Sequence, residues 1–184
     1  MNVLVTGALG QLGRDVVREV NRRGYLCTAA DFRAAGSEAE TSSRTRFVQL
    51  DITDREAVDG IIQETQPDAV IHCAAWTDVE EAEKAENRSR VDAVNRLGTQ
   101  YVAEAAKAVD AKMIYISTDY VFDGQGDSPW EPDGRRFGPL NVYGQSKLDG
   151  ERAVASVLDK YFIVRISWAF GSGWTAGLAA AESI

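Results

Sequence analysis

Short apolar runs alternate along the chain with segments whose apolar residues recur at helical spacing. Six runs are typical of strands, at about positions 3–5, 26–30, 47–50, 69–73, 112–117 and 162–166. Helical patterns lie between them, at about 11–23, 54–64 and 89–109. Nearly continuous apolar strands separated by helices favour parallel pairing in a sheet covered on both faces. The pattern predicts an α/β fold with a Rossmann-type, doubly wound parallel sheet, which binds ligands at the carboxyl ends of its strands.

Two polar stretches interrupt this alternation. Positions 33–46 carry clustered Ser and Thr, and positions 123–140 are rich in Gly, Pro and Asp. Both are expected to be loops. A loop as long as the second is uncommon within a compact domain and is usually either functional or disordered.

A glycine-rich loop follows the first strand and opens the first helix. Gly7 permits a tight turn, Gly10 lets the backbone approach a pyrophosphate, and Gly13 lets helix and sheet pack closely. The spacing is G-x-x-G-x-x-G rather than G-x-G-x-x-G, but the strand–loop–helix context favours the same use. We therefore expect a dinucleotide at this loop, which also includes Gln11 and Leu12, with its phosphates at the helix start.

The ends of the second and third strands offer side chains for the adenosine part of a dinucleotide. Asp31 lies 18 residues after Gly13 (31 − 13), near the usual offset of an acidic residue that binds ribose hydroxyls, which favours NADH. Arg33 either pairs with a 2′-phosphate, which favours NADPH, or is a solvated loop charge. Asp51, followed by Ile52, either binds the adenine amino group or caps the next helix. These alternatives stay open at this point.

Tyr143 and Lys147 are spaced i and i+4, so that on a helix they share a face. A phenol ordinarily has a pKa of about 10, and a cation held close lowers that pKa by favouring the phenolate. Tyr143 can then exchange a proton with an oxygen that gains charge as hydride reaches its carbon. In a helix after the fifth strand of a dinucleotide-binding sheet, the pair predicts hydride transfer. The alternative is an amphipathic helix with a solvated Lys147.

Polar residues also lie within or at the ends of the central strands. Ser117 and Thr118 close the fifth strand, and from position alone either hydroxyl qualifies to hydrogen-bond a reacting carbonyl, although both could simply end the strand. His72, the only histidine, lies inside the fourth strand and is expected to be a core residue with its hydrogen bonds satisfied. Cys27 and Cys73 are expected to be reduced core thiols.

Composition narrows the range of partners. The chain has 184 residues, enough for one domain with a sizeable core, and a formal net charge of −8. Because an acidic chain repels phosphate backbones, we expect no nucleic-acid partner. The sequence contains no apolar run long enough to span a membrane, no secretory signal before the first strand and no Cys or His cluster with metal-ligand spacing. We expect a cytoplasmic protein that binds neither membrane nor metal.

Four stretches together resemble the dTDP-4-dehydrorhamnose reductases, which belong to the extended short-chain dehydrogenase/reductase family. They are the glycine loop, A-A-W-T-D-V-E from Ala74, S-T-D-Y-V-F-D-G from Ser117 and P-L-N-V-Y-G-Q-S-K-L-D-G-E from Pro139. The resemblance extends over about 1–171, which we interpret as an NAD(P)-binding Rossmann domain. Positions 172–184 do not resemble the continuation of that family, so we expect a divergent or truncated tail and a substrate domain that is mostly missing.

The resemblance implies reduction of the 4-keto group of dTDP-4-dehydro-L-rhamnose to dTDP-L-rhamnose, with NADPH or NADH as cofactor. It implies a carbonyl hydrogen bond from Thr118, proton donation by Tyr143, and for Lys147 both activation of the tyrosine and a contact to the nicotinamide ribose. Asn95 matches a position that helps to shape the cofactor site. The same site would further include Ala74, Ala75 and Thr77.

Two other functions stay open. A regulatory subunit of methionine adenosyltransferase resembles the same reductases and binds a dinucleotide as a partner protein. The intact Thr118, Tyr143 and Lys147 argue against such a loss of catalysis, whereas the missing substrate region argues for it. Another extended-family enzyme, an epimerase or dehydratase, would share the glycine loop and the Tyr/Lys pair, with Asp119 as its acidic group.

The missing region also bears on activity and assembly. The substrate implied by the resemblance is a dTDP-linked deoxyhexulose, and we expect the 184-residue chain to bind cofactor but to turn this substrate over poorly. Apolar sheet and helix surface would be left uncovered. A homodimer is compatible with the sequence, which does not determine the oligomeric state.

Overall fold

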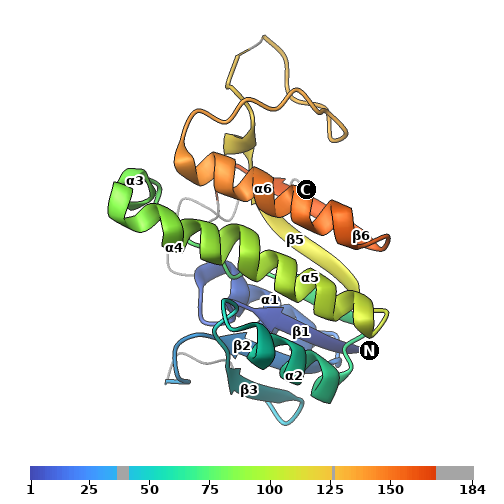
Figure 1. The fold of residues 1–184 in the computed structure, drawn as a ribbon. Helices are drawn as coiled ribbons and strands as arrows, with labels where there is room; N and C mark the ends of the chain where they lie inside the picture. Colours follow the sequence, from blue (N-terminus) through green and yellow to red (C-terminus); the bar gives the residue numbers. More distant parts are fainter. Residues whose placement is uncertain (37–41, 126, 169–184) are drawn as a thin grey trace.

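The computed structural model describes residues 1–36, 42–125 and 127–168. The tail expected over 172–184 lies outside the described residues. The described residues form one α/β unit with six parallel strands (Figure 1). In chain order the strands are β1 (Asn2–Thr6), β2 (Leu26–Asp31), β3 (Thr45–Gln49), β4 (Ala69–His72), β5 (Lys112–Thr118) and β6 (Tyr161–Ile166).

The strand order across the sheet is β3-β2-β1-β4-β5-β6, and each neighbouring pair is parallel. The order reverses between β1 and β4, which is the switch point where doubly wound sheets bind their ligands. The predicted Rossmann-type sheet is therefore confirmed, with every strand bound within two residues of the expected one.

Helices connect the strands at the predicted places. They are α1 (Gln11–Arg22), α2 (Arg55–Thr65), α3 (Val79–Glu83), α4 (Arg88–Asp92), α5 (Thr99–Ala108) and α6 (Val142–Val157). Short 3-10 turns occur at Ala85–Asn87 and Asp119–Val121, and a π-helical turn at Ala93–Gly98 joins α4 to α5. The single helix expected at 89–109 is thus one continuous rod with a π turn inside it, a feature that frequently marks a functional site.

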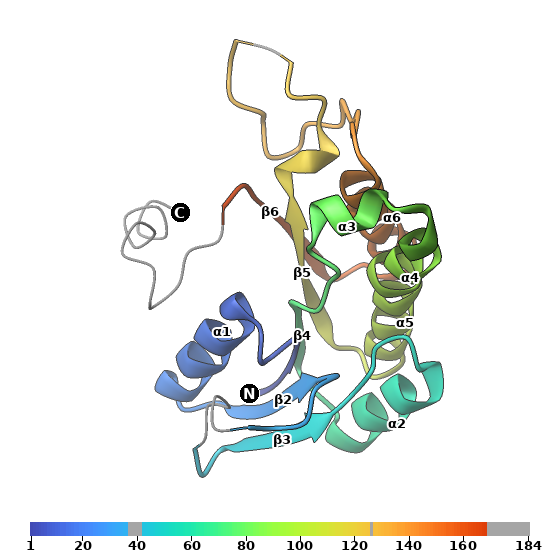
Figure 2. The same cartoon turned by 90° about the vertical axis from the view of Figure 1, so that its left-hand side faces the viewer.

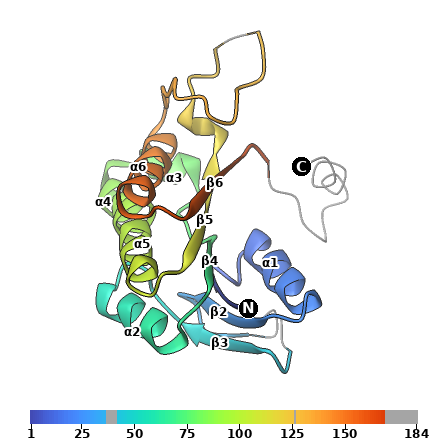
Figure 3. The ribbon, with the colours of Figure 1, turned by 90° about the vertical axis from the view of Figure 1, so that its right-hand side faces the viewer.

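The two faces of the sheet are covered unequally. Figures 2 and 3 show α2, α5 and α6 together on one face and α1 on the other. The larger apolar cluster lies under the three helices, and the smaller one lies between α1, β1 and β2. Among the described residues, α1 is the helix on its face, and Ile114, Ile116 and Val164 remain partly exposed while Phe162 is 69% exposed. The expectation of a sheet covered on both faces is therefore wrong for β5 and β6 within the described ranges, and apolar surface is uncovered there, as the sequence analysis expected.

No helix among the described residues is long and apolar enough to cross a membrane.

The packing of α1 on the sheet yields a stability prediction. A Cβ atom on Gly13 would overlap the carbonyl oxygen of Gly7 and lie 2.8 Å from its carbonyl carbon, so Gly13→Ala should force the loop and helix apart. Gly60 lies in α2 with open space around its Cβ position. We expect chemical denaturation to show a loss of about 1–3 kcal/mol for Gly13→Ala. The control, Gly60→Ala, should gain about 0.5–1 kcal/mol. Equal stability of the two variants would contradict the close packing.

Candidate active site

The glycine loop turns sharply between β1 and α1. Gly7 has a φ of +66°, and a Cβ atom there would lie 2.7 Å from the backbone nitrogen of Ala74 in the segment after β4. Helix α1 begins after Gly10 with no side-chain cap and no acidic residue in its first turn. The positive end of this helix dipole is therefore not neutralised by a carboxylate of its own first turn, and the loop has the form that holds a phosphate.

Asp31 and Arg33 are paired with each other. The Asp31 side chain is buried, and its Oδ2 accepts the backbone N–H of Leu9 at 2.9 Å. Its Oδ1 accepts from the backbone N–H and the Nε of Arg33, both at 3.1 Å. The acidic and basic residues that the sequence offered as alternatives thus form one unit, which also anchors the glycine loop.

Asp51 lies at the carboxyl end of the sheet and does not cap α2. Its Oδ1 accepts from the N–H and the hydroxyl of Thr53, at 2.9 and 2.8 Å, whereas Asp54 is the residue that caps α2 by accepting the N–H of Ala57. The capping alternative for Asp51 is therefore wrong, and its exposed carboxylate faces solvent beyond β3. The neighbouring Ile52 is buried in the larger core.

Asn95 ties the segment after β4 to α6. This residue is fully buried in the π-helical turn, and its Oδ1 accepts the N–H of Trp76 at 2.8 Å. Its Nδ2 donates to the carbonyl oxygen of Trp76 at 3.1 Å and to Ser146 Oγ at 2.9 Å. Thr6 Oγ1 accepts the N–H of Ala74 at 3.3 Å on the other side of the same segment, which also contains Ala75 and Thr77.

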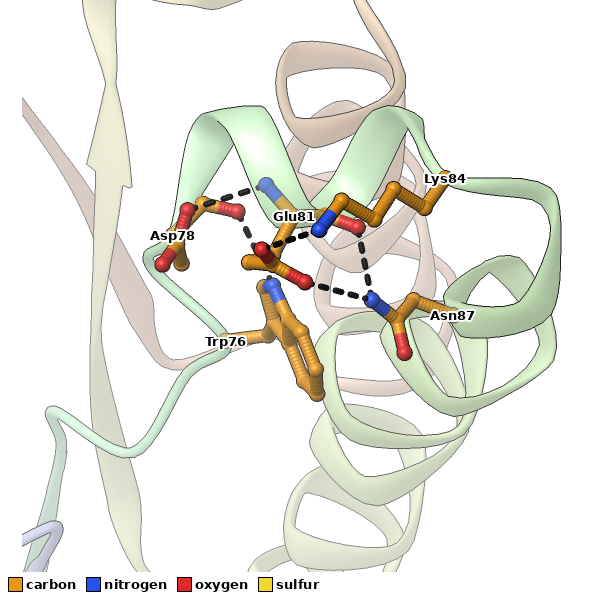
Figure 4. Close-up of polar contacts among 5 residues, drawn as sticks. All are labelled: Trp76, Asp78, Glu81, Lys84 and Asn87. Carbon is orange, nitrogen blue, oxygen red and sulfur yellow. Dashed lines mark hydrogen bonds and ion pairs between the residues drawn. The ribbon is translucent and has the colours of Figure 1, made fainter.

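The acidic stretch after this segment forms its own network (Figure 4). Asp78 caps α3 by accepting the N–H of Glu81 at 2.9 Å, and its carbonyl oxygen accepts the indole N–H of Trp76 at 2.9 Å. Asn87 Nδ2 donates to the carbonyl oxygen and to Oε2 of Glu81, at 2.9 and 3.1 Å, and Lys84 pairs with Oε1. The stretch is a short helix, α3, in which Glu81 is paired with Lys84.

Lys147 is buried on the side of α6 that faces the sheet. Its Nζ donates to the carbonyl oxygen of Ile116 at 2.7 Å and lies 4.1 Å from the centre of the Tyr115 ring. Burial lowers the pKa of Lys147 to about 7, although Cys73 and Glu151 nearby act to raise it. The alternative of a solvated lysine is therefore wrong.

Tyr143 shares this face of α6, one turn before Lys147, but its electrostatics differ from the expectation. Burial raises the pKa of Tyr143, a hydrogen bond with Thr118 acts to lower it, and the charge of Asp119 acts to raise it. The expected lowering of this pKa by Lys147 is wrong in this structure, because the ammonium is held by Ile116 and the Tyr115 ring. Tyr143 thus keeps its proton at neutral pH.

The two hydroxyls at the end of β5 have different partners. Ser117 is buried and donates to Glu151 Oε1 at 2.6 Å, two helical turns along α6 from Tyr143. Thr118 Oγ1 donates to Asp119 Oδ1 at 3.3 Å and accepts the N–H of Tyr120 at 3.2 Å, and it lies near enough to Tyr143 to lower the pKa of that phenol. The structure therefore brings Thr118, Tyr143 and Lys147 together at one edge and assigns Ser117 a different, structural contact.

Two residues of this region were not singled out by the sequence analysis. Glu151 follows Lys147 by four residues, so the same helical spacing that pairs Tyr143 with Lys147 also places Glu151 on the buried face. Arg165 is a charged residue within an otherwise apolar strand, which is a signal for a buried partner. Their carboxylate and guanidinium form a two-pronged ion pair, at 2.9 and 2.8 Å.

His72 has both ring nitrogens hydrogen-bonded in the core. Nδ1 lies 2.7 Å from Thr6 Oγ1, and Nε2 lies 3.1 Å from Thr99 Oγ1. Burial lowers the pKa of His72 to about 3, and the positive charge of Lys147 adds to this effect. The expectation of a satisfied core histidine is confirmed. The two cysteines are free, and burial raises the pKa of the Cys73 thiol to about 12 and that of Cys27 to about 11, so both stay protonated.

Within the described ranges, no group of three or more His, Cys, Asp or Glu residues lies close enough together to hold a metal ion.

Comparisons with known proteins point to one family. A family model described as "RmlD substrate binding domain" matches residues 1–178. The chain is 43% identical over 171 residues to a dTDP-4-dehydrorhamnose reductase of Streptomyces griseus, covering 92% of this chain and 50% of the relative. It is 42% identical over 155 residues to the methionine adenosyltransferase 2 subunit beta of Pongo abelii, covering 83% of this chain and 42% of the relative.

A solved structure matches this chain over a similar length. The dTDP-4-dehydrorhamnose reductase of Bacillus anthracis in complex with NADP superposes with a TM-score of 0.79 at 38% identity, covering 92% of this chain and 54% of that one. The chain thus spans about half the length of the relatives and structures that it matches.

The buried histidine yields a prediction about stability and pH. His72 is the only histidine, and its folded-state pKa of about 3 lies below the ordinary value of 6.5, so the unfolded chain binds the proton first as pH falls. The free energy of unfolding should therefore decrease below about pH 6.5, by at most about 1.4 kcal/mol per pH unit. Lys147, with a folded-state pKa of about 7 against an ordinary 10.5, adds a contribution of the same sign that fades as the pH falls below 7 and is common to the unmodified chain and the variant. Urea denaturation between about pH 7 and pH 5 measures the free energy of unfolding at each pH, and this free energy should fall less steeply with pH in His72→Asn than in the unmodified chain. An equally steep fall in both proteins would contradict a buried His72 that stays neutral.

Proposed function

The chain belongs to the RmlD substrate binding domain family, and from this premise we propose that it forms the cofactor-binding part of an NAD(P)H-dependent dTDP-4-dehydrorhamnose reductase. The reaction is the reduction of the 4-keto group of dTDP-4-dehydro-L-rhamnose to give dTDP-L-rhamnose. The observation that carries the proposal is that Thr118 ends β5 close to Tyr143 of α6, with a buried Lys147 one helical turn further along that helix.

The chain's own residues fit a nicotinamide dinucleotide. The uncapped start of α1 would hold the pyrophosphate against Gly10, Gln11, Leu12 and Gly13. The Asp31–Arg33 pair would face the adenosine ribose, with Asp51 toward the adenine. Ala74, Ala75, Thr77 and Asn95 would border the nicotinamide side, where the buried Asn95 holds the segment in place. When bound, the reduced cofactor supplies the hydride.

The state of Tyr143 matches the acid that a ketone reduction requires. Because burial raises its pKa, the phenol carries a proton at neutral pH and can donate it to the keto oxygen as that oxygen gains charge. The hydroxyl of Thr118 would hydrogen-bond the same oxygen and stabilise the developing charge. Lys147, with a pKa of about 7, would be the group that returns a proton to Tyr143 after the phenol has given up its own.

A second candidate function is a partner protein that binds a dinucleotide without catalysis. The 42% identity to the methionine adenosyltransferase 2 subunit beta of Pongo abelii is the observation that favours it. We rank it second because Thr118 and Tyr143 form a site suited to proton transfer, which a binding protein does not need.

The proposal extends to location and partners. The substrate would be a dTDP-linked deoxyhexulose, and the protein would act in the cytoplasm, where the two free thiols Cys27 and Cys73 stay reduced. The net charge of −8 argues against a nucleic-acid partner. A homodimer remains compatible with the uncovered face of β5 and β6.

The proposed function is tested by replacing the acid. Tyr143→Phe removes the transferable proton but keeps the ring, so ketosugar-dependent oxidation of NADPH should fall by a factor of about 10² to 10⁴. The assay should be run on this chain and on this chain continued with the second half of a full-length relative. Cofactor affinity, measured by calorimetry, should change little. Cofactor binding with no oxidation in either protein would contradict the reductase and support the partner protein.

Arg33 is expected to set the preference between the two cofactors. Arg33→Ala removes a guanidinium that could pair with a 2′-phosphate and leaves the buried Asp31 carboxylate uncompensated. Because the Arg33 side chain is 46% exposed, we expect only about a fivefold loss of NADPH affinity relative to NADH. The matched control is Arg23→Ala, which breaks an exposed pair with Glu19 at the other end of α1. A ratio of affinities that does not move would show that Arg33 is only a loop charge.

A further inference from the structure

A buried carboxylate behind the candidate site collects three contacts. Glu151 of α6 is 3% exposed, and its Oε1 accepts from Ser117 Oγ at 2.6 Å. The guanidinium of Arg165 on β6 donates to both carboxylate oxygens, at 2.9 and 2.8 Å. One carboxylate therefore links the end of β5, the edge strand β6 and the helix that carries Tyr143.

The outer side of Arg165 continues this link into the long loop. Its guanidinium lies 5.2 Å from the centre of the Phe122 ring and 5.1 Å from that of Phe137, within the range of cation–π attraction. Its Nη1 also donates to the carbonyl oxygen of Pro132 at 3.4 Å. The ring of Trp130 stacks on Phe122, with centres 4.4 Å apart and planes 4° from parallel. The guanidinium of Arg165 thus contacts the part of the loop over 130–137 at more than one point.

The two ends of this loop flank the two candidate catalytic hydroxyls. The chain enters the loop just after Thr118 and the 3-10 turn, and it leaves at Asn141, which caps α6 two residues before Tyr143 (Figure 1). The backbone N–H of Gly138 donates to the carbonyl oxygen of Val121 at 3.0 Å and closes the loop at its base. Any shift of the loop base therefore moves Thr118 and Tyr143 relative to each other.

We propose that Arg165 and Glu151 are positioning residues, which clamp the base of the long loop, between Val121 and Gly138, so that Thr118 and Tyr143 keep their relative position. The effect of the clamp on catalysis rests on the proposed function, whereas its contacts involve no cofactor or substrate. It also gives the long polar loop, which the sequence analysis singled out, a defined role. Glu151 acts at the same time on the buried Lys147, whose charge it favours.

The competing explanation is that the pair only stabilises the fold. Removing one member of a buried ion pair leaves an uncompensated charge and destabilises, whereas removing both is often close to neutral. If the pair only stabilises the fold, the double variant should regain both the stability and the loop position of the unmodified chain. If the pair is a clamp, the double variant should regain stability while its loop stays released, since a glutamine makes no cation–π contact with Phe122 and Phe137.

The experiment measures stability and loop release separately in the 184-residue chain. Arg135 and Arg136 are exposed in the loop and offer a trypsin site whose cleavage rate reports loop opening. A single 3-fluorotyrosine at position 143, observed by fluorine NMR, reports the surroundings of the phenol. The variants are Arg165→Gln, Arg165→Lys, Glu151→Gln and the double Arg165→Gln/Glu151→Gln. Arg152→Gln is the matched control, because Arg152 pairs with Asp149 on the exposed side of α6.

We expect cleavage after Arg135 and Arg136 to rise about tenfold or more in Arg165→Gln and to stay high in the double variant. The fluorine signal should shift in both, the melting temperature should recover in the double variant, and Arg165→Lys should give intermediate cleavage. The control should match the unmodified chain. Unchanged cleavage and an unchanged fluorine signal in folded Arg165→Gln, or full recovery of both in the double variant, would overturn the proposal. No readout uses turnover, so failure here is distinct from failure of the proposed reductase activity.

Discussion

The candidate site depends on how closely α6 approaches the sheet. A Cβ atom on Gly144 would overlap the carbonyl oxygen of Tyr120, and one on Gly150 would lie 2.5 Å from the carbonyl oxygen of Asn95 and overlap the Tyr115 hydroxyl. Only glycine fits at these two places, one near each end of the segment that carries Tyr143 and Lys147. Because the helix lies this close, a phenol on it reaches the threonine at the end of β5, and its lysine is buried against that strand.

The same close approach shapes the electrostatics of the region. Lys147 is removed from water, which lowers its pKa to about 7, and the carboxylate whose charge acts to raise that pKa is Glu151, itself held by Ser117 and Arg165. Taking an ion out of water is costly, and a buried ion is therefore usually held by a partner charge and by hydrogen bonds. Tyr143 is affected in the opposite sense: burial raises its pKa, and it stays a proton donor. The proposed ketone reduction would use this protonated phenol as its acid.

Helix α1, which follows the glycine loop, and helix α6 lie on opposite faces of the sheet (Figures 2 and 3), and polar contacts through the core connect the two sides. Thr6, at the end of β1, contacts His72 of β4, which contacts Thr99 of α5. Asn95, in the π-helical turn before α5, holds the segment after β4 and contacts Ser146 of α6. The relative position of a cofactor on the loop and of Tyr143 on α6 is thus set by buried hydrogen bonds, which are costly to leave unmade.

The sequence by itself determined the sheet, the helices, the glycine loop and the Tyr143–Lys147 pair, because apolar periodicity and residue spacing act locally along the chain. It also indicated His72 as a core residue, since a single polar residue within an apolar strand is enough for that inference. Only the tertiary structure gave Ser117 and Thr118 their different partners, paired Asp31 with Arg33, moved the cap of α2 from Asp51 to Asp54 and reversed the pKa shift of Tyr143. Each of these depends on which donor, charge or ring lies across the sheet or on a neighbouring helix, and on how far water is excluded, and neither is set by local spacing.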